Sequence, residues 1–181
     1  MFDIEFINET IEEGGEILQL GNITLGEVTE GFTASLSFWS IKDYQKQWLE
    51  AARRLLETDS PSAFISCMYD PEKANFINWW PVWRTSPFAV FQEQLFFMNQ
   101  DSEDEEGKSL EVRFSLTNPY ASVADWDSTH CEECRKTGVC HRPRLGKILP
   151  EQDVDYCPSE WCVQLGDIKD FVSRRIIDWA T

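Results

Sequence analysis

The chain has 181 residues, of which 42% are hydrophobic and 13% aromatic, so it can bury a core and is too apolar to be disordered as a whole. Its 16 Lys and Arg residues stand against 32 Asp and Glu residues, which gives a net charge of −16. Because this charge repels the phosphates of nucleic acids and of anionic membranes, we expect a single folded domain over residues 1–181 that binds neither.

The N-terminal segment and the apolar runs indicate where the protein resides. The sequence MFDIEFINET lacks the basic region and the apolar region of a signal peptide. No apolar run approaches the roughly 20 residues that a membrane-spanning helix needs. We therefore expect a cytoplasmic protein, in which the six cysteines would be reduced.

The first part of the chain predicts β-strands. In FDIEFI (2–7), apolar and acidic residues alternate, which is typical of a strand with one buried face. The pair Gly14 and Gly15 breaks the chain before the apolar run EILQL. Three further glycines predict a series of short strands and turns. These are Gly21, Gly26 and Gly31.

Residues 41–57 predict a long amphipathic helix. Apolar side chains recur there at helical spacing, at Ile41, Tyr44, Trp48, Ala52, Leu55 and Leu56. Ser40 and Asp43 are spaced as in a capping box, and Glu50 and Arg54 are spaced to pair on the polar side. The helix should end before Pro61, because proline disfavours helical geometry in the residue that precedes it.

Four more strands are predicted at residues 62–69, 75–83, 88–97 and 110–116, each bounded by turn residues. Their short connections favour an antiparallel meander with the 41–57 helix packed on one face. The segment NWWPVWR could form an aromatic cage for a ligand, but in a strand its tryptophans are expected to fill the core. These are Trp79, Trp80 and Trp83, with Arg84 near the strand's end.

The regular pattern is lost over about 121–158, which we interpret as an irregular, cysteine-rich insert in the domain. After it, the sequence predicts a short strand, a turn at Gly166 and a C-terminal helix that starts near Asp167. The predicted fold is thus of the α+β class: one domain with an antiparallel β-sheet, a long helix and a C-terminal helix.

Acidic residues gather in two places. Residues 1–41 hold eight Asp and Glu and no Lys or Arg, and five carboxylates lie among the six positions 101–106. The predicted strands that flank this second group place it at the tip of a hairpin. An acidic run is most often a solvated loop, but it can also belong to a surface that attracts a basic protein.

The insert contains a cluster of cysteines and histidines within THCEECRKTGVCHRP (129–143). The three thiols and one imidazole are of the kind that tetrahedral zinc prefers, and the alternatives are reduced cysteines in a surface loop or a disulfide. The candidate ligands are Cys131, Cys134, Cys140 and His141. Because zinc would order a long loop, its role would be structural, and the alternative function is a zinc-binding structural or adaptor protein.

Little in the sequence supports catalysis. Both histidines, His130 and His141, lie in the insert, so no histidine elsewhere could act as a general base. A redox-active Cys-x-x-Cys pair would need a strand-to-helix context that residues 131–134 lack. There is no phosphate-binding glycine loop and no nucleophile elbow. We therefore expect a protein that is not an enzyme, with no cofactor other than the structural zinc just described.

Several segments together resemble the immunity proteins of contact-dependent growth inhibition and related polymorphic-toxin systems of bacteria. They are FWSIKDYQKQWLEAARRL, SAFISCM, NFINWWPVWR, FQEQLFF, NPY and SEWCVQLGDIKDFV. The resemblance covers residues 31–120 and 159–172, rests on aromatic spacing, and does not include the insert. It implies a non-catalytic inhibitor that binds the C-terminal toxin domain of a large effector, often a nuclease with a cationic surface.

This resemblance gives the acidic residues a predicted role in binding a basic toxin domain. In such interfaces an aromatic anchor and one or two desolvated charges carry most of the energy, while charges at the rim set the association rate. The predicted partner-binding residues are Asp101, Glu103, Asp104, Glu105 and Glu106 in the hairpin, and Asp125, Trp126 and Asp127 in the insert.

Overall fold

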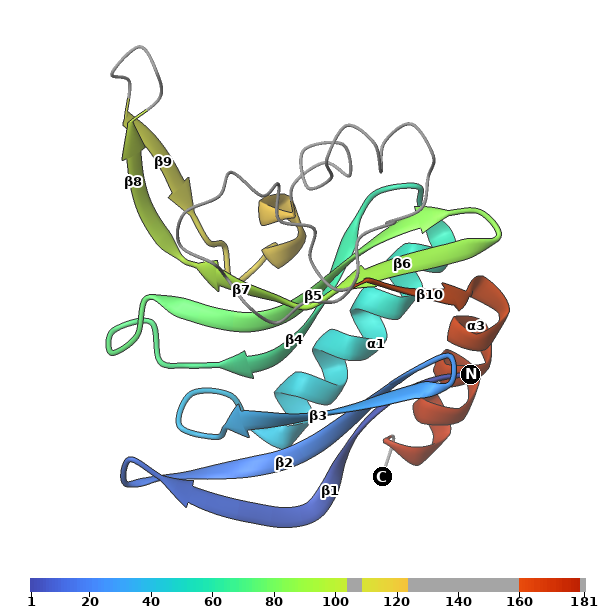
Figure 1. The fold of residues 1–181 in the computed structure, drawn as a ribbon, viewed down its shortest axis with the longest axis horizontal. Coiled ribbons are helices and arrows are strands. Elements are labelled where there is room, and N and C mark those ends of the chain that lie inside the picture. Colours follow the sequence, from blue (N-terminus) through green and yellow to red (C-terminus); the bar gives the residue numbers. More distant parts are fainter. Residues whose placement is uncertain (104–108, 124–159, 180–181) are drawn as a thin grey trace, which may run out of the picture.

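The computed structural model describes residues 1–103, 109–123 and 160–179, and for residues 99–103 and 109–113 it describes the backbone alone. Figure 1 shows two larger sheets side by side, with a long helix behind them and a small hairpin that projects from one end. The N-terminus lies beside the start of the C-terminal helix, and the Met1 ammonium group is 3.1 Å from Asp167.

The first three strands form an antiparallel sheet in the order of the chain, drawn in blue in Figure 1. They are β1 (Phe2–Glu13), β2 (Glu16–Leu25) and β3 (Val28–Ser35). Phe2 and Ile4 are buried on the inner face, as the alternating pattern predicts. Gly14 and Gly15 have φ values of +61° and +84°, which is why glycine suits the tight turn between β1 and β2.

The prediction of short strands broken at each glycine was wrong for Gly21 and Gly31, which lie inside β2 and β3. Gly21 has a packing role there. A Cβ atom at this position would collide with the ring of Phe32 and lie 2.8 Å from the backbone oxygen of Glu5. The absence of a side chain lets Phe32 lie across the sheet and reach the core, where it contacts the rings of Trp48 and Trp80.

The long helix α1 (Ile41–Glu57) has the predicted bounds. The predicted capping box is confirmed: the Ser40 hydroxyl accepts from the Asp43 backbone N–H, and Asp43 accepts from the Ser40 backbone N–H at 2.8 Å. The ion pair at Glu50 differs from the prediction. Glu50 lies 3.9 Å from Lys46, while Arg54 donates to the backbone oxygen of Pro61.

One face of α1 covers the edge of β4 (Ser62–Met68), a strand that is buried along its whole length. Gln47 donates to the backbone oxygen of Ala63 at 2.7 Å and accepts from the backbone N–H of Ile65 at 3.1 Å. Trp48 donates to the oxygen of Ile65 at 2.8 Å. Helix side chains thus take the place of a neighbouring strand, which satisfies backbone groups that would otherwise be buried without partners.

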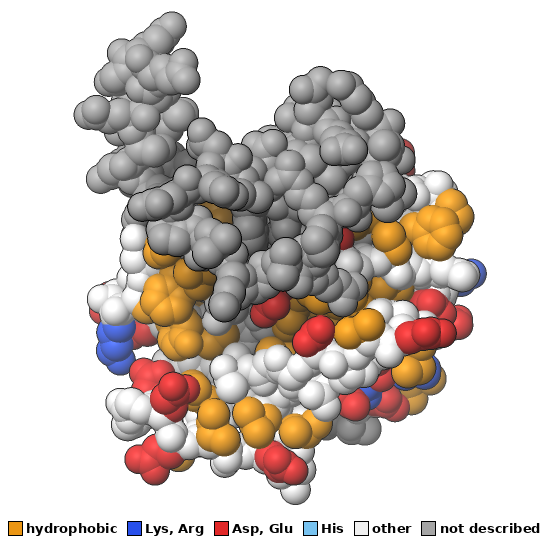
Figure 2. All heavy atoms as spheres, in the orientation of Figure 1, with side chains coloured by type: hydrophobic (Ala, Val, Ile, Leu, Met, Phe, Trp, Pro, Cys, Tyr) orange, Lys and Arg blue, Asp and Glu red, His pale blue; other side chains and the backbone are white. Residues whose placement is uncertain are grey.

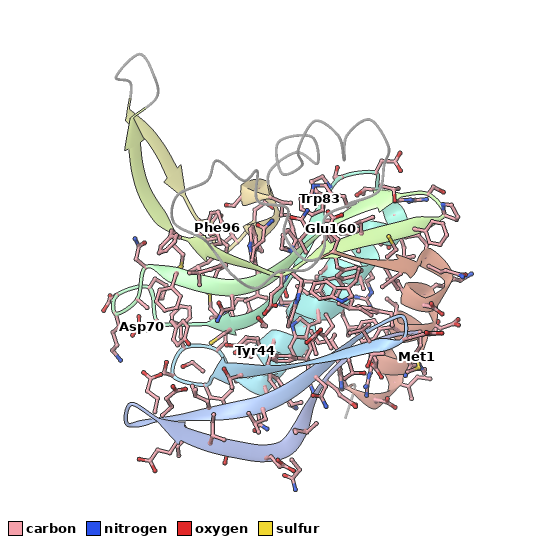
Figure 3. All side chains as sticks on the ribbon, in the orientation of Figure 1. Met1, Tyr44, Asp70, Trp83, Phe96 and Glu160 are labelled. Carbon is pink, nitrogen blue, oxygen red and sulfur yellow. The ribbon has the colours of Figure 1, made fainter. Side chains whose placement is uncertain are left out.

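Tyr44 joins the two larger sheets where β3 meets β4, and Figure 3 shows it between them. Its hydroxyl donates to the oxygen of Ser35 and accepts from the N–H of Met68, both at 2.8 Å. Burial raises the pKa of Tyr44 far above its usual value, so the hydroxyl stays protonated and can make both bonds.

The second sheet contains β4, β5 (Phe76–Thr85), β6 (Phe88–Gln92), β7 (Gln94–Phe97) and β10 (Glu160–Gln164). Its order is β10-β6-β5-β4, and β7 pairs with β5 beside β6. The tryptophans of β5 are buried, which confirms that they belong to the core. β10 takes the outer position next to β6, although a long stretch of chain separates the two in sequence.

The predicted strand 88–97 is divided into β6 and β7 at Glu93. The register continues across the break, since Phe91 faces Val82 and Gln94 faces Trp79. Pro81 lies opposite this break and has no backbone N–H to donate to a ladder. The interruption leaves Glu93 outside the regular hydrogen bonding of the sheet.

β8 (Asn99–Glu103) and β9 (Ser109–Arg113) form a two-stranded antiparallel hairpin. A hairpin around the acidic run was predicted, but its first strand is 99–103 and not 88–97, so Asp101 and Glu103 lie in a strand and not at the tip. Residues 104–108 lie outside the described residues. A short 3-10 helix, η1 (Pro119–Ser122), follows. Residues 124–159, which make up nearly all of the predicted insert, also lie outside the described part.

The chain ends in α3 (Leu165–Asp178), which follows β10 directly. The predicted turn at Gly166 was wrong, because Gly166 lies in the first turn of this helix. Ile168 and Phe171 are its buried residues, and Phe171 packs against Phe2 with ring centroids 5.0 Å apart. The predicted α+β class with a long helix and a C-terminal helix is confirmed, and the antiparallel strands are divided among separate sheets.

Candidate partner-binding surface

Most of the predicted site residues lie outside the described residues. Asp101 and Glu103 are in β8, in register with Glu111 and Ser109. The remaining predicted residues lie outside the described part of the chain: Asp104, Glu105, Glu106, Asp125, Trp126, Asp127, Cys131, Cys134, Cys140 and His141. Their roles in partner binding or zinc binding stay predictions. Within the described ranges, no group of three or more His, Cys, Asp or Glu side chains is placed to hold a metal ion.

The N-terminal sheet carries an acidic surface. Among the described residues, Asp3 and Glu5 near α3 are paired with Arg175. The far half of β1 and the β2–β3 turn hold exposed carboxylates at Glu9, Glu12, Glu13 and Glu27, and residues 1–41 contain no Lys or Arg. Figure 2 shows acidic side chains along the part of this face that the blue sheet occupies in Figure 1.

The β1–β2 hairpin extends beyond the core and also exposes apolar side chains. Ile11 is 40% exposed and Ile17 65% exposed. The register of β1 shifts between Phe6 and Thr10, and the Gln19 amide donates to the backbone oxygens of Ile7 and Glu9 at this irregularity. Such a bulge re-aims a strand, so both faces of the hairpin beyond it reach solvent.

A groove of about 390 Å³ lies between the two larger sheets. β2 and β3 form one wall, which is open at Gly31, and the second sheet contributes Ser66, Asn78 and Glu93. Ser66 lies where the register of β4 shifts, and its hydroxyl donates to the backbone oxygen of Asn78 at 3.0 Å. Glu93 is in the break between β6 and β7. Irregularities in neighbouring strands thus place polar groups along one side of the groove.

One carboxylate, that of Glu93, belongs to the described lining of this groove. Partial loss of water around its carboxyl group raises the pKa of Glu93, and the carboxylate of Glu30 on β3 raises it further. No Lys or Arg is among the described residues that line the groove. The Glu93 side chain is exposed, so the groove carries a solvated negative charge at its edge.

Exposed apolar side chains continue the same surface along β7. Leu95 is 52% exposed and Phe97 43% exposed. Residues two apart in a strand share a face, and Leu95 is the register partner of Asn78, which lines the groove. Figure 2 shows hydrophobic side chains gathered on the side of this face where β7 lies. The groove is therefore bordered by an apolar strip as well as by the Glu93 carboxylate.

Basic residues gather on a different part of the molecule. Lys42, Lys46 and Arg53 line a second groove of about 230 Å³ on the outer side of α1, next to Trp179. In Figure 1 this helix lies behind the sheets. Glu50 also lines this groove and lies 3.9 Å from Lys46, so the outer side of α1 has mixed charge, in contrast to the acidic N-terminal sheet.

Sequence reasoning did not identify Glu93 as a site residue. It was predicted to lie within a continuous strand, and nothing in the sequence places it beside the N-terminal sheet. Two features of the sequence bear on the groove. Gly31 lies inside a strand, where the missing side chain leaves the backbone accessible, and Pro81 lacks the N–H group that regular hydrogen bonding between strands needs. Neither signal says which residues meet.

No helix in the described part of the chain is long and apolar enough to cross a membrane.

Comparison with known proteins yields one consistent family. The family model described as CdiI N-terminal domain matches residues 34–171. The immunity protein CdiI of Enterobacter cloacae subsp. cloacae is 29% identical over 129 residues, which cover 70% of this chain and 89% of that protein. A solved structure described as a CdiA-CT/CdiI toxin and immunity complex from Enterobacter cloacae contains a chain with a TM-score of 0.69 and 26% identity.

That structural match covers 97% of this chain and 99% of the matched chain, so it includes the N-terminal sheet that precedes the family-model match. The resemblance inferred from the aromatic segments is confirmed. The chain belongs to the CdiI family of immunity proteins of contact-dependent growth inhibition.

Proposed function

We propose that this chain is an immunity protein that binds the toxin domain of its own CdiA-type effector in the cytoplasm and blocks that domain's activity, without catalysing a reaction. The observation that carries the proposal is the likeness, over nearly the full length of both chains, to a chain of a solved toxin and immunity complex. The 29% identity to a curated immunity protein supports it.

The charge distribution supports a basic partner. A toxin that acts on nucleic acid needs a cationic surface for phosphates, and the acidic N-terminal sheet would be attracted to such a surface. Charge complementarity of this kind mainly accelerates association, while contacts at the centre of the interface slow dissociation. We infer a cationic toxin domain, with nuclease activity as the chemistry that best fits the charge.

Co-expression tests the function directly. The toxin domain encoded beside this chain is induced in bacteria alone, with this chain, or with the CdiI of Enterobacter cloacae as a specificity control, and viable cells are counted. We expect killing by the toxin alone, survival with this chain, and no protection by the control. A harmless toxin domain or failure of this chain to rescue growth would overturn the proposal.

Association with the toxin domain should slow steeply as salt rises from low to physiological concentration, because exposed charges separated by more than about 8–10 Å are then screened. Stopped-flow or biosensor measurements of the association rate, made with a catalytically inactive toxin domain, check this expectation. An association rate that does not change with salt would mean that the acidic surface acts only as a solvated surface.

Two matched variants show which carboxylates steer the partner. One neutralises Glu9, Glu12, Glu13 and Glu27 of the N-terminal sheet, and the other neutralises Glu103, Asp104, Glu105 and Glu106 of the hairpin. Each removes four charges from the net charge of −16, so any difference between them reflects position. We expect the sheet variant to lose more of the salt dependence, because its exposed carboxylates belong to a segment, residues 1–41, that contains no Lys or Arg.

A further inference from the structure

We propose that the free edge of β3, over residues 29–33, pairs with an extended, basic segment of the toxin domain, which adds a strand to the N-terminal sheet and fills the groove between the two larger sheets. This inference rests on the proposed function and goes further, because it names the part of the surface that meets the partner and the kind of segment that this surface accepts.

The register between β2 and β3 shows which backbone groups of β3 point away from its sheet. Leu25 and Val28 flank a two-residue turn, so they exchange backbone hydrogen bonds, and every second residue of β3 after Val28 bonds to β2 in the same way. Glu30 and Phe32 therefore bond to β2. The backbone N–H and C=O groups of the alternate residues point to the other side of β3. These are Thr29, Gly31, Thr33 and Ser35.

In the described part of the chain, these outward groups have partners only at one end of β3. The N–H of Ser35 donates to the Cys67 sulfur at 3.3 Å, and the Ser35 oxygen accepts from the Tyr44 hydroxyl at 2.8 Å. The outward backbone groups of Thr29, Gly31 and Thr33 form no hydrogen bond to another described residue. A strand edge with unpaired backbone groups is a template for one more strand.

This edge of β3 is accessible. Thr29 and Gly31 are exposed, and because Gly31 has no side chain, its exposed surface is backbone. Gly31 and Thr33 line the groove of about 390 Å³, to which β4, β5 and the break between β6 and β7 also contribute residues. In Figure 1, β3 is the strand of its sheet nearest to β4 and β5, so a segment paired with β3 would lie in this groove.

The second sheet offers apolar contacts to such a segment. Leu95 is the register partner of Asn78, which lines the groove, and both Leu95 and Phe97 are exposed. Side chains of an added strand would alternate between two faces, so those on one face can pack on this apolar strip while the backbone pairs with β3. In strand addition, backbone bonds supply affinity and side-chain contacts supply specificity.

Charge favours the toxin domain over a second copy of this chain as the occupant. Residues 1–41, which include β3, hold eight Asp and Glu and no Lys or Arg, and the described lining of the groove holds no Lys or Arg either. Pairing between the β3 edges of two copies would bring two such segments together, and like charges repel. A segment that carries Lys or Arg would be attracted to the same edge.

Amide hydrogen exchange of the wild-type chain tests the pairing directly, followed by NMR with and without a catalytically inactive toxin domain. In the free chain, the amides of Gly31 and Thr33 should exchange fast, and those of Glu30 and Phe32, which bond to β2, should exchange slowly. In the complex, exchange at Gly31 and Thr33 should slow by about tenfold or more.

Two results of this experiment would overturn the inference. One is unchanged exchange at Gly31 and Thr33 in a complex that forms. The other is slow exchange at both positions in the free chain that becomes faster on dilution, which would mean that the edge pairs with a second copy.

Two substitutions at one position separate backbone pairing from packing. Gly31→Pro removes the outward N–H and leaves the bonds between β2 and β3 in place, since proline is tolerated on this side of an edge strand. Gly31→Ala keeps the N–H, and its Cβ would lie 3.8 Å from the Asn22 side chain, an ordinary contact. In calorimetry with the inactive toxin domain, Gly31→Pro should weaken binding about tenfold or more and Gly31→Ala less than about threefold. Equal affinities of the two variants would contradict the pairing.

The outcomes separate this inference from the proposed function. If the wild-type chain neither binds the toxin domain nor protects cells, the proposed function fails. If the wild-type chain does both, while Gly31 and Thr33 exchange as fast in the complex as in the free chain, the edge of β3 is not the site and the function stands. Thermal unfolding shows whether Gly31→Pro is folded, and the exchange measurement decides the question without that variant.

Discussion

Replacing Gln47 with leucine should lower the free energy of unfolding by about 2–4 kcal/mol. The Gln47 side chain is buried and bonds two backbone groups of β4, the oxygen of Ala63 and the N–H of Ile65. Leucine has a similar size but no polar atoms, so both backbone groups would lose their partner inside the protein. Each unsatisfied buried group costs about 1–3 kcal/mol, and the added apolar contact offsets part of this cost.

Urea or thermal denaturation checks this expectation, and for a chain of this length the midpoint should fall by about 5–15 °C. The matched control is Gln45→Leu, the same change at a half-buried position of α1 that lines the outer groove. It should change stability by about 0.5 kcal/mol or less. Equal effects of the two substitutions would contradict the role assigned to Gln47 at the edge of β4.

Replacing Arg175 with methionine should destabilise the protein by about 2–3 kcal/mol. Its guanidinium binds Asp3 through contacts of 2.8 and 3.0 Å and Glu5 at 2.6 Å, which attaches α3 to the first strand. The Arg175 side chain is 12% exposed and that of Asp3 17%, so these charges are screened much less than surface charges. Methionine keeps an apolar stem but removes the bidentate pair and the guanidinium group that lies over the Trp179 ring, 5.5 Å from its centroid.

The neighbouring Arg174 provides the control for this prediction. Its side chain is 46% exposed and contacts Asp3 at 3.2 Å, so Arg174→Met should cost about 1 kcal/mol or less. Denaturation of both variants at low and high salt separates the two cases. The Arg175 variant should differ from wild type at both salt concentrations, and a difference that disappears in high salt would mean that the pair is a solvated one.

The regular elements were predictable where their signals are local. The bounds of α1 follow from the Ser40 capping box and a helical period, both of which act within a few residues. The strand of Phe2 and Ile4 follows from alternation. The start of α3 was predicted two residues late, because Gly166 was interpreted as a turn, although glycine is tolerated in a first helical turn when packing supports the helix.

The candidate groove could not be predicted in this way. The two walls of the groove lie next to each other because Tyr44 bonds to Ser35 of β3 and to Met68 of β4, which aligns one edge of each sheet. The position of β10 beside β6 and the contact between α3 and β1 likewise connect the end of the chain to its beginning and middle. Such contacts depend on the packing of whole elements, which periodicity and turn residues do not encode.

The sequence by itself therefore determined the α+β class, the long helix, the core tryptophans and the negative charge of the N-terminal segment, because composition and short-range patterns specify these features. It also carried the resemblance to immunity proteins in its aromatic spacing. The tertiary structure alone decided how the strands divide into sheets and how Glu93 comes to border a groove beside an apolar strip. The physical reason is that a binding surface is assembled from distant segments, and only the packed core places them side by side.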